Sequence, residues 1–245
     1  MWGAERMKKI SVIVLVVLGL AFAGMAEAAK PKKRTRNANR VGPYGSVHVG
    51  MSTYGGDQSN DEQSLLDLFA NAGVPVQNAS ASTDDSDIGY LASFGYRFNR
   101  YIAFELGLAQ YGSLESTGHA EVDLPNDGQG FVPANLEYSF DVGGPLISAV
   151  GTLPIGEKFE VYARLGFIFA SVEREFSSRV GGERGVTGSA KGDSQVPVYG
   201  VGLSWNINQV YSIRGEYQLL SDVGQDSRTG TEDLKTLSLG MLMRF

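Results

Sequence analysis

The sequence predicts an all-β fold, an eight-stranded antiparallel transmembrane β-barrel. Segments in which apolar and polar residues alternate recur through residues 42–245, and this period of two is typical of strands with one apolar face. Three short turns alternate with four longer polar connections, as in barrels that cross an outer membrane. The last segment, T-L-S-L-G-M-L-M-R-F, is an apolar strand whose free edge a closed barrel would remove. An ordinary sandwich strand is the alternative for this segment.

The composition agrees with a barrel and restricts the chemistry. The mean hydropathy is −0.11, which a barrel reaches because only alternate strand residues face lipid. The chain has no cysteine and two histidines, so it has no disulfide, no thiol nucleophile and few groups for acid–base chemistry. Nothing in the composition indicates a nucleic-acid ligand, since residues 41–245 hold 25 acidic and 12 basic side chains.

Two segments precede the predicted barrel. Residues 1–28 have a charged start, an apolar run and the sequence Ala26-Glu27-Ala28, which together predict a cleaved signal peptide; an uncleaved anchor is the alternative. Residues 29–41 form a basic arm, with six Lys or Arg and no acid among residues 30–40, and are predicted to be disordered. This arm is either a solvated tail or a weak contact for cell wall or anionic head groups.

The strands are predicted in order from their alternation. The first, at about residues 43–54, turns His48 inward, and the hairpin at residues 88–109 turns Glu105 inward. A strand at about residues 136–153 includes a predicted bulge at Gly143-Gly144-Pro145; the facing of residues 146–153 is not assigned. The remaining strands are expected at about residues 159–169, 198–207, 211–219 and 236–245.

Long polar connections are expected between these strands, at residues 55–87, 115–135, 175–194 and 221–233. A short helix is possible at residues 64–70. The short turns are expected at Asn99-Arg100 and at residues 154–158 and 206–209. The aromatic residues near these turns are predicted to form a girdle at one membrane boundary.

Charged residues on inward faces need partners, because an isolated charge in a narrow lumen is costly. By alternation, four such residues point into the barrel: Glu105, Arg164, Arg214 and Glu216.

Several segments together resemble one family, the OmpA-type outer-membrane β-barrel (transmembrane domain) family. These are G-Y-L-A-S-F-G-Y-R-F-N-R-Y-I-A-F-E-L-G-L-A-Q-Y-G-S-L from Gly89, E-K-F-E-V-Y-A-R-L-G-F from Glu157, residues 196–219 and the closing L-S-L-G-M-L-M-R-F. The resemblance implies a lumen plugged by charged side chains, with Glu105 and Arg214 as a gate supported by Arg164 and Glu216. Ser204 stands where the family has an acid that competes for the gate arginine. Phe245 would end the segment that the barrel assembly machinery reads.

The predicted function is that of a structural or surface-interaction barrel with a charged, plugged lumen and four extracellular loops. The alternative is a small ion-conducting channel gated by a lumenal salt bridge. A barrel enzyme such as a lipid A deacylase is disfavoured, because the strand of His48 supplies no acid and His119, in a predicted loop, has no serine nearby at the barrel wall. No catalytic residue, metal or cofactor is predicted, and the acidic loops lack a recognised calcium-binding spacing.

The predicted location is the outer membrane of a Gram-negative cell, with both termini in the periplasm, since eight strands return the chain to its starting side. The expected partners are outer-membrane lipid, lipopolysaccharide and the barrel assembly machinery.

Overall fold

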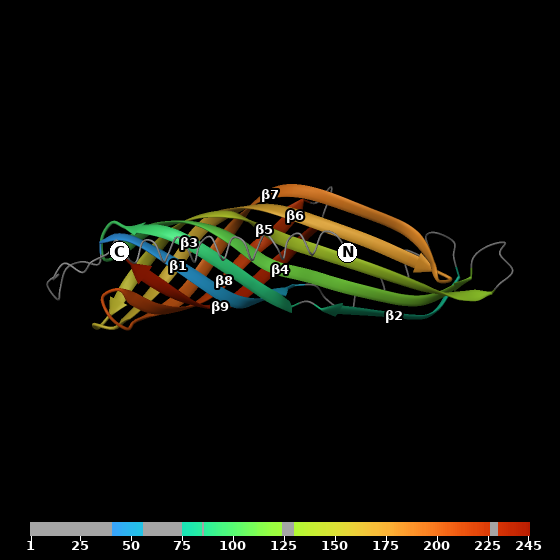
Figure 1. Ribbon diagram of the computed structural model, residues 1–245, viewed down its shortest axis with the longest axis horizontal. Helices are drawn as coiled ribbons and strands as arrows, with labels where there is room; N and C mark the ends of the chain where they lie inside the picture. The colour runs from blue at the N-terminus through green and yellow to red at the C-terminus, as the bar shows by residue number, and fades with distance from the viewer. Residues whose placement is uncertain (1–40, 56–74, 85, 124–129, 226–229) are drawn as a thin grey trace.

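The computed structural model describes residues 41–55, 75–84, 86–123, 130–225 and 230–245 (Figure 1). The predicted signal peptide, the basic arm and the possible helix at residues 64–70 lie outside these ranges. Within them, no helix is long and apolar enough to cross a membrane.

The described chain is built from long antiparallel strands. They are β1 (Gly42–Tyr54), β2 (Val76–Asp84), β3 (Ser86–Arg97), β4 (Ile102–Asp123), β5 (Phe131–Ile155), β6 (Phe159–Val180), β7 (Glu183–Asn206), β8 (Tyr211–Gln225) and β9 (Gly230–Arg244).

Eight of these strands form a closed ring. The pairing order is β4-β3-β1-β9-β8-β7-β6-β5, and β5 pairs back with β4. The first and last strands of the ring are neighbours, with Tyr44 opposite Arg244 and Tyr54 opposite Leu234. The predicted eight-stranded barrel is therefore confirmed, and its terminal strand has no free edge.

Three tight turns lie at one end of the ring, which we call the short-turn end. The side chain of Asn99 accepts hydrogen bonds from the backbone N–H groups of Tyr101 and Ile102, at 2.7 and 3.0 Å. Asn208 does the same for Val210 and Tyr211, at 2.8 and 2.7 Å. Asparagine is suited to this role because its short side chain mimics a turn of backbone. All three predicted turns are confirmed.

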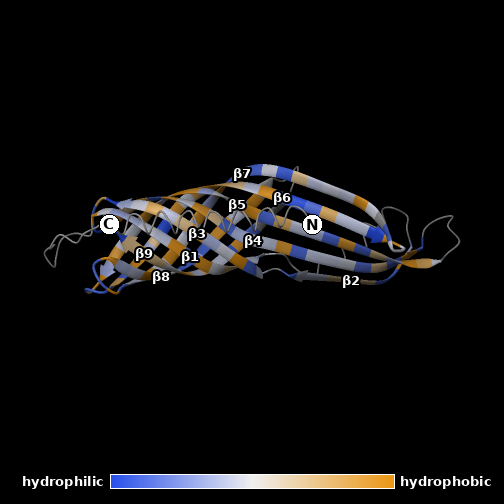
Figure 2. Cartoon of the chain, in the orientation of Figure 1, coloured by the Kyte–Doolittle hydropathy of each residue, from blue (hydrophilic) through white to orange (hydrophobic). Residues whose placement is uncertain are grey.

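The outer surface of the ring is apolar, as the alternation predicted. Figure 2 shows bands of hydrophobic residues around the barrel, whereas the strands that project from its far end are mostly polar. Exposed side chains on the ring include Phe94, Leu106, Ile147, Leu165, Val201 and Leu239. One exception is Met243, which is buried and lies directly opposite Tyr211 in the β8–β9 ladder. In β5, Leu146, Ser148, Val150 and Thr152 point inward.

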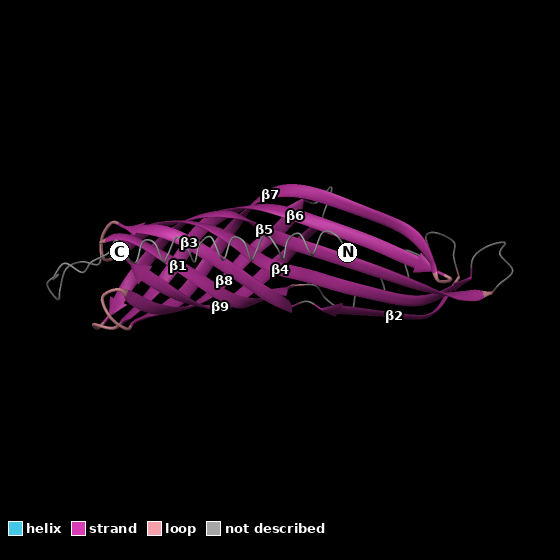
Figure 3. Ribbon diagram, viewed as in Figure 1, coloured by secondary structure: helices cyan, strands magenta, loops and turns pink. Residues whose placement is uncertain are grey.

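Within the described residues, the predicted long connections are wrong for most of their length; residues 56–74 of the first connection lie outside those residues. The chain continues as strand through residues 115–123 and 131–135, through residues 175–180 and 183–194, and through β2 (Figure 3). Strands β2, β4, β5, β6 and β7 thus project beyond the ring at what we call the hairpin end (Figure 1). Beyond the apolar belt neither face must be hydrophobic, so the hydropathy alternation fades although the hydrogen-bonded ladder continues.

The irregularity predicted at Gly143-Gly144-Pro145 lies in the partner strand. The β4–β5 register shifts between Gln110 and Ser113, where Gly112 has a φ of 81°. The carboxylate of Asp87 accepts hydrogen bonds from the backbone N–H and the hydroxyl of Ser113, at 2.9 and 3.2 Å. A glycine at positive φ permits this bulge, which reverses the facing of the rest of β4: Tyr111 and Leu114 both point inward.

Candidate functional site

The lumen of the ring holds the four charged residues that the sequence selected. Glu105 on β4, Arg164 on β6, and Arg214 and Glu216 on β8 occupy inward positions and are at most 2 % exposed. Their strand neighbours Phe104, Leu106 and Leu165 point outward to the apolar belt. Strand alternation is therefore what brings ionised side chains inside a cylinder with a hydrophobic exterior.

The four side chains form one chain of alternating charge. Arg214 Nη1 lies 3.0 Å from Glu105 Oε1, and Arg164 Nη1 lies 2.8 Å from Glu105 Oε2. Arg164 Nε also lies 2.6 Å from Glu216 Oε1. Two carboxylates and two guanidinium groups make the cluster neutral, and Arg164 occupies its centre because it contacts both acids. The structure thus places Glu105 and Arg214 in contact. It also shows that Arg164 contacts both acids, whereas the resemblance implied only a supporting role for it.

Neutral side chains complete the hydrogen bonding of the two acids. Tyr44 and Tyr162 donate to Glu105 and Glu216, at 2.6 and 2.9 Å, and Gln218 donates to Glu216 at 2.9 Å. These residues were not singled out from the sequence, although each shares the inward parity of its strand. Full pairing of buried charges is what makes such a network tolerable in a narrow interior.

Two glycines make room for the tyrosine rings. A Cβ at Gly95 would collide with the ring of Tyr44, and a Cβ at Gly202 would collide with the ring of Tyr162. The same rings flank Arg214, whose guanidinium lies 4.7 Å from the centre of Tyr162 and 5.5 Å from that of Tyr44. Small residues on β3 and β7 therefore allow aromatic faces to enclose the cation.

A second ion pair lies nearer the short-turn end. Both guanidinium nitrogens of Arg97 donate to the two oxygens of Glu160, at 3.2 and 3.1 Å, and both residues are buried. Arg244 donates to Ser212 and Asn206 at 2.8 and 2.9 Å. Arg97, the last residue of β3, was not predicted as a site residue. The alternation along β3 nevertheless places it on the same inward face as Ser93 and Gly95.

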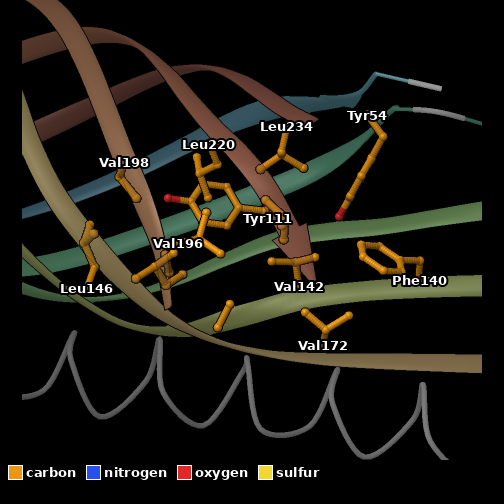
Figure 4. Packing of buried hydrophobic residues seen from close by; sticks show 14 of the residues in the cluster. Tyr54, Tyr111, Phe140, Val142, Leu146, Val172, Val196, Val198, Leu220 and Leu234 are labelled. Atoms are coloured by element: carbon orange, nitrogen blue, oxygen red, sulfur yellow. The ribbon is translucent and has the colours of Figure 1, made fainter. Parts of the chain in front are cut away.

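The lumen toward the hairpin end is filled by hydrophobic side chains. Figure 4 shows Tyr111, Val196, Val198 and Leu220 converging from β4, β7 and β8. Tyr54 and Phe140 pack edge to face with centroids 6.0 Å apart. We call the following set the apolar layer, and every member is at most 8 % exposed: Tyr54, Leu91, Ala109, Tyr111, Leu114, Phe140, Val142, Leu146, Ile168, Ala170, Val172, Val196, Val198, Leu220, Val223 and Leu234.

The apolar layer is joined to the charged cluster. The hydroxyl of Tyr111 donates to Gln218 Oε1 at 3.0 Å, and Gln218 in turn contacts Glu216. The layer was not predicted, and among its members only Leu114 lies on β4 beyond the bulge. Along the barrel axis the lumen thus holds an apolar layer, a neutral charged cluster and a second ion pair.

The two histidines occupy sites that do not suit acid–base catalysis. His48 is inward and buried as predicted, and neither ring nitrogen forms a hydrogen bond within the described residues. His119 lies on the outer face of the projecting part of β4, where its Nδ1 is 2.6 Å from the side-chain oxygen of Asn135. Across the described ranges, no three His, Asp or Glu side chains are grouped to hold a metal ion.

Phe245 lies at the junction of the first and last strands. Its ring stacks on Phe94 with centroids 6.4 Å apart, and its backbone N–H donates to the carbonyl of Pro43 at 3.1 Å. The C-terminal aromatic is therefore fixed on the outer face at the short-turn end, beside the strands that close the ring.

Comparisons with known proteins identify the family. The model of the OmpA-like transmembrane domain family matches residues 44–245. Outer membrane protein A of Yersinia pseudotuberculosis is 27% identical over 240 residues, covering 98% of this chain and 56% of the relative. The protein of the same name from Serratia marcescens is 28% identical over 240 residues, with 98% and 56% covered. The chain thus spans about half the length of the curated relatives it matches.

Solved barrels give weaker matches. Neisserial surface protein A has a TM-score of 0.41 at 13% identity, with 83% of this chain and 97% of that chain covered. Pseudomonas aeruginosa OprG has a TM-score of 0.43 at 13% identity, with 86% and 100% covered. From the family match, the chain belongs to the OmpA-like transmembrane domains, outer-membrane β-barrels of Gram-negative bacteria.

Proposed function

We propose that this chain is a structural and surface-interaction barrel of the outer membrane that does not conduct ions. The observation that carries the proposal is the occupied lumen. An eight-stranded barrel has an interior just wide enough for side chains, and here those side chains form an apolar layer and a fully paired charged cluster. An ion in transit would have to shed water in the first and displace a partner in the second.

The alternative is a small channel gated by the Glu105–Arg214 pair. The observation in its favour is that this pair lies in the lumen and has a second cation, Arg164, in contact with the same carboxylate. A gate requires a rearrangement of this kind, in which the Glu105 carboxylate changes from one arginine partner to the other. The intact apolar layer opposes it, because the pair is not the sole obstruction.

Wild-type protein purified from outer membranes should be heat-modifiable on a gel and silent in planar lipid bilayers. Heat modification reports the folded barrel, so silence cannot then be attributed to misfolding. Steady single-channel current from heat-modifiable protein would support the channel and remove the structural proposal.

A catalytic role is not part of this proposal. The lumenal acids are held by arginines and tyrosines, and the buried His48 contacts no carboxylate that would orient it as a general base. The relatives are outer membrane proteins of the OmpA type. The partners we infer are outer-membrane lipid, lipopolysaccharide and the barrel assembly machinery, with weak contact of residues 29–41 to cell wall or anionic head groups.

We infer that the hairpin end faces outward and that both termini lie in the periplasm. Tight turns on the inner side and long excursions on the outer side are usual for this architecture. Protease added to intact cells should therefore cut near residues 56–74, 124–129 or 226–229 and spare residues 30–40. An epitope tag inserted at residue 35 provides the control. The protease should remove this tag only after the outer membrane is permeabilised. Cutting at the tag in intact cells would contradict the orientation.

Deleting Phe245 should reduce the amount of barrel inserted in cells more than it reduces the stability of the folded protein. The residue contributes one stacked ring and one terminal hydrogen bond, yet it ends the segment proposed as the assembly signal. Heat-modifiable protein in outer membranes should fall, whereas protein refolded into detergent should unfold at nearly the same urea concentration. Phe98→Ala, at the same end of the ring, is the matched control. Normal insertion without Phe245 would contradict the signal role.

A further inference from the structure

His48 lies inside the ring beside the charged cluster and takes no part in its hydrogen bonds. The residue is 4 % exposed, and neither ring nitrogen forms a hydrogen bond within the described residues. Buried polar groups in folded proteins are nearly always paired, so a buried imidazole without a partner is unusual. Histidine is also the side chain whose charge changes near neutral pH. A group of this kind links the packing of the lumen to the pH.

A glycine on the last strand sets the position of the His48 ring. His48 on β1 is opposite Gly240 on β9, and a Cβ at Gly240 would collide with the ring. Gly240 is in turn opposite Arg214 on β8, and the next inward pair along these two strands is Ser238 with Glu216. The ring therefore covers the glycine, which brings it toward the inward side chains of β8.

The charged residues that act most on His48 come from three other strands. They are Glu216 and Arg214 on β8, Arg164 on β6 and Glu105 on β4. Its own strand, β1, carries no acid and no Lys or Arg.

The remaining ionisable groups of this part of the lumen are already bonded or neutral. Arg97 on β3 is paired with Glu160, and Arg244 on β9 donates to Ser212 and Asn206. Three inward tyrosines complete the set, and a phenol stays neutral at and below pH 8: Tyr44, Tyr111 and Tyr162.

The charged cluster is neutral only while His48 is neutral. Glu105 and Glu216 balance Arg164 and Arg214, and a proton on His48 adds a third cation to these two acids. An uncompensated charge is costly in an enclosed interior, so an imidazolium here must take an acceptor from the cluster. Of the two acids, Glu216 acts more strongly on His48, and His48 acts on Glu216 in return.

We propose that His48 makes the lumen sensitive to acid: a proton on its imidazole draws Glu216 away from Arg164 and loosens the barrel. Neutral His48 leaves the contact between Arg164 Nε and Glu216 Oε1 undisturbed at 2.6 Å. In acid, the imidazolium competes for the same carboxylate, and Arg164 then keeps only Glu105 and Ser148. This response to acid does not depend on whether the lumen conducts.

Because the chain has two histidines, two single variants identify the one that responds. Protein in lipid vesicles is unfolded with urea at about pH 8 and about pH 5, after heat modification on a gel has shown that each sample is folded. The unfolded chain takes up a proton that the enclosed lumen resists, so stability falls as the pH falls. One such proton raises the equilibrium constant for unfolding by up to about tenfold per pH unit below about pH 6.5.

The urea midpoint of wild-type protein should therefore be lower in acid. His48→Gln keeps a polar side chain that does not titrate, and it should remove most of that decrease. His119→Gln, on the outer face, is the matched control and should retain the decrease in full. Carboxylates titrate alike in all three proteins, so the difference between them isolates His48.

Nuclear magnetic resonance tests the exchange of partners in protein that retains His48. The Nε–H signal of Arg164, identified by its loss in Arg164→Lys, should shift as the imidazole signal of His48 changes to its charged form. The Arg164 signal should not shift in His48→Gln. The proposal is overturned if acid lowers the midpoint of His48→Gln as much as that of wild type, or if His119→Gln removes the decrease. An Arg164 signal that stays in place while His48 becomes charged would also overturn it.

Discussion

Replacing Arg164 by methionine should destabilise the barrel by about 3–5 kcal/mol, the cost of breaking a buried ion pair by removing one partner. Arg164 contacts Glu105 at 2.8 Å and Glu216 at 2.6 Å. Without it, Glu105 keeps Arg214, but Glu216 retains only the neutral donors Tyr162 and Gln218. The free energy of unfolding from lipid vesicles in urea, followed by circular dichroism, measures the effect.

Two variants make this test specific to charge. Arg214→Met should lower the free energy of unfolding by less than Arg164→Met does. Glu105 stays paired with Arg164 in that variant, so both acids still contact a cation. Combining Arg164→Met with Glu216→Gln should restore part of the lost stability, since an amide is cheaper to bury than a carboxylate. If Arg214→Met proves as costly as Arg164→Met, or if the double variant shows no recovery, the central place of Arg164 in the cluster is wrong.

The barrel itself could be predicted because a membrane enforces a simple rule on each strand. Lipid requires apolar side chains on one face of each strand. The outward facing of Phe94, Leu106, Leu165 and Leu239 could therefore be predicted from the alternation alone. Beyond the belt that requirement ends, and the projecting strands then resemble polar loops. Their ladders depend on backbone hydrogen bonds, which leave little trace in side-chain hydropathy. The predicted long connections failed for this reason.

The same contrast explains the site. Glu105, Arg164, Arg214 and Glu216 could be placed inside by parity alone, because charges stand out between outward hydrophobic residues. The partners that a long side chain contacts could not be predicted in the same way. The alternation along a strand shows that Arg164 points inward, but not that it contacts two acids. The bulge at Gly112 also changes the facing of β4, so inward Leu114 and outward Leu108 have the same sequence parity. That change hid the inward position of Leu114.

The apolar layer alters what loss of the ion pair should do. If the Glu105–Arg214 pair alone closed the lumen, Arg214→Ala would admit water through it. In the structure, that substitution leaves Tyr111, Phe140, Leu146, Ile168 and Leu220 in place on the hairpin side. Water gains little by entering a gap lined with hydrophobic side chains, so this layer remains closed when the charges below it are changed.

Arg214→Ala should therefore show no more current than wild type in planar bilayers. The double variant Arg214→Ala with Arg97→Ala should also show none, because it breaks both ion pairs but leaves the apolar layer. Steady current should appear only when Leu146→Ser and Leu220→Ser are added, because two large apolar side chains are then replaced by small polar ones that water can solvate. Each leucine change costs about 2–5 kcal/mol, so heat modification on a gel must show that the protein remains folded. Phe167→Ser with Leu203→Ser, on the lipid-facing side, replaces the two leucine changes as the control and should not open the barrel. Steady current from Arg214→Ala alone would show that the ion pair is the barrier and that the apolar layer is not.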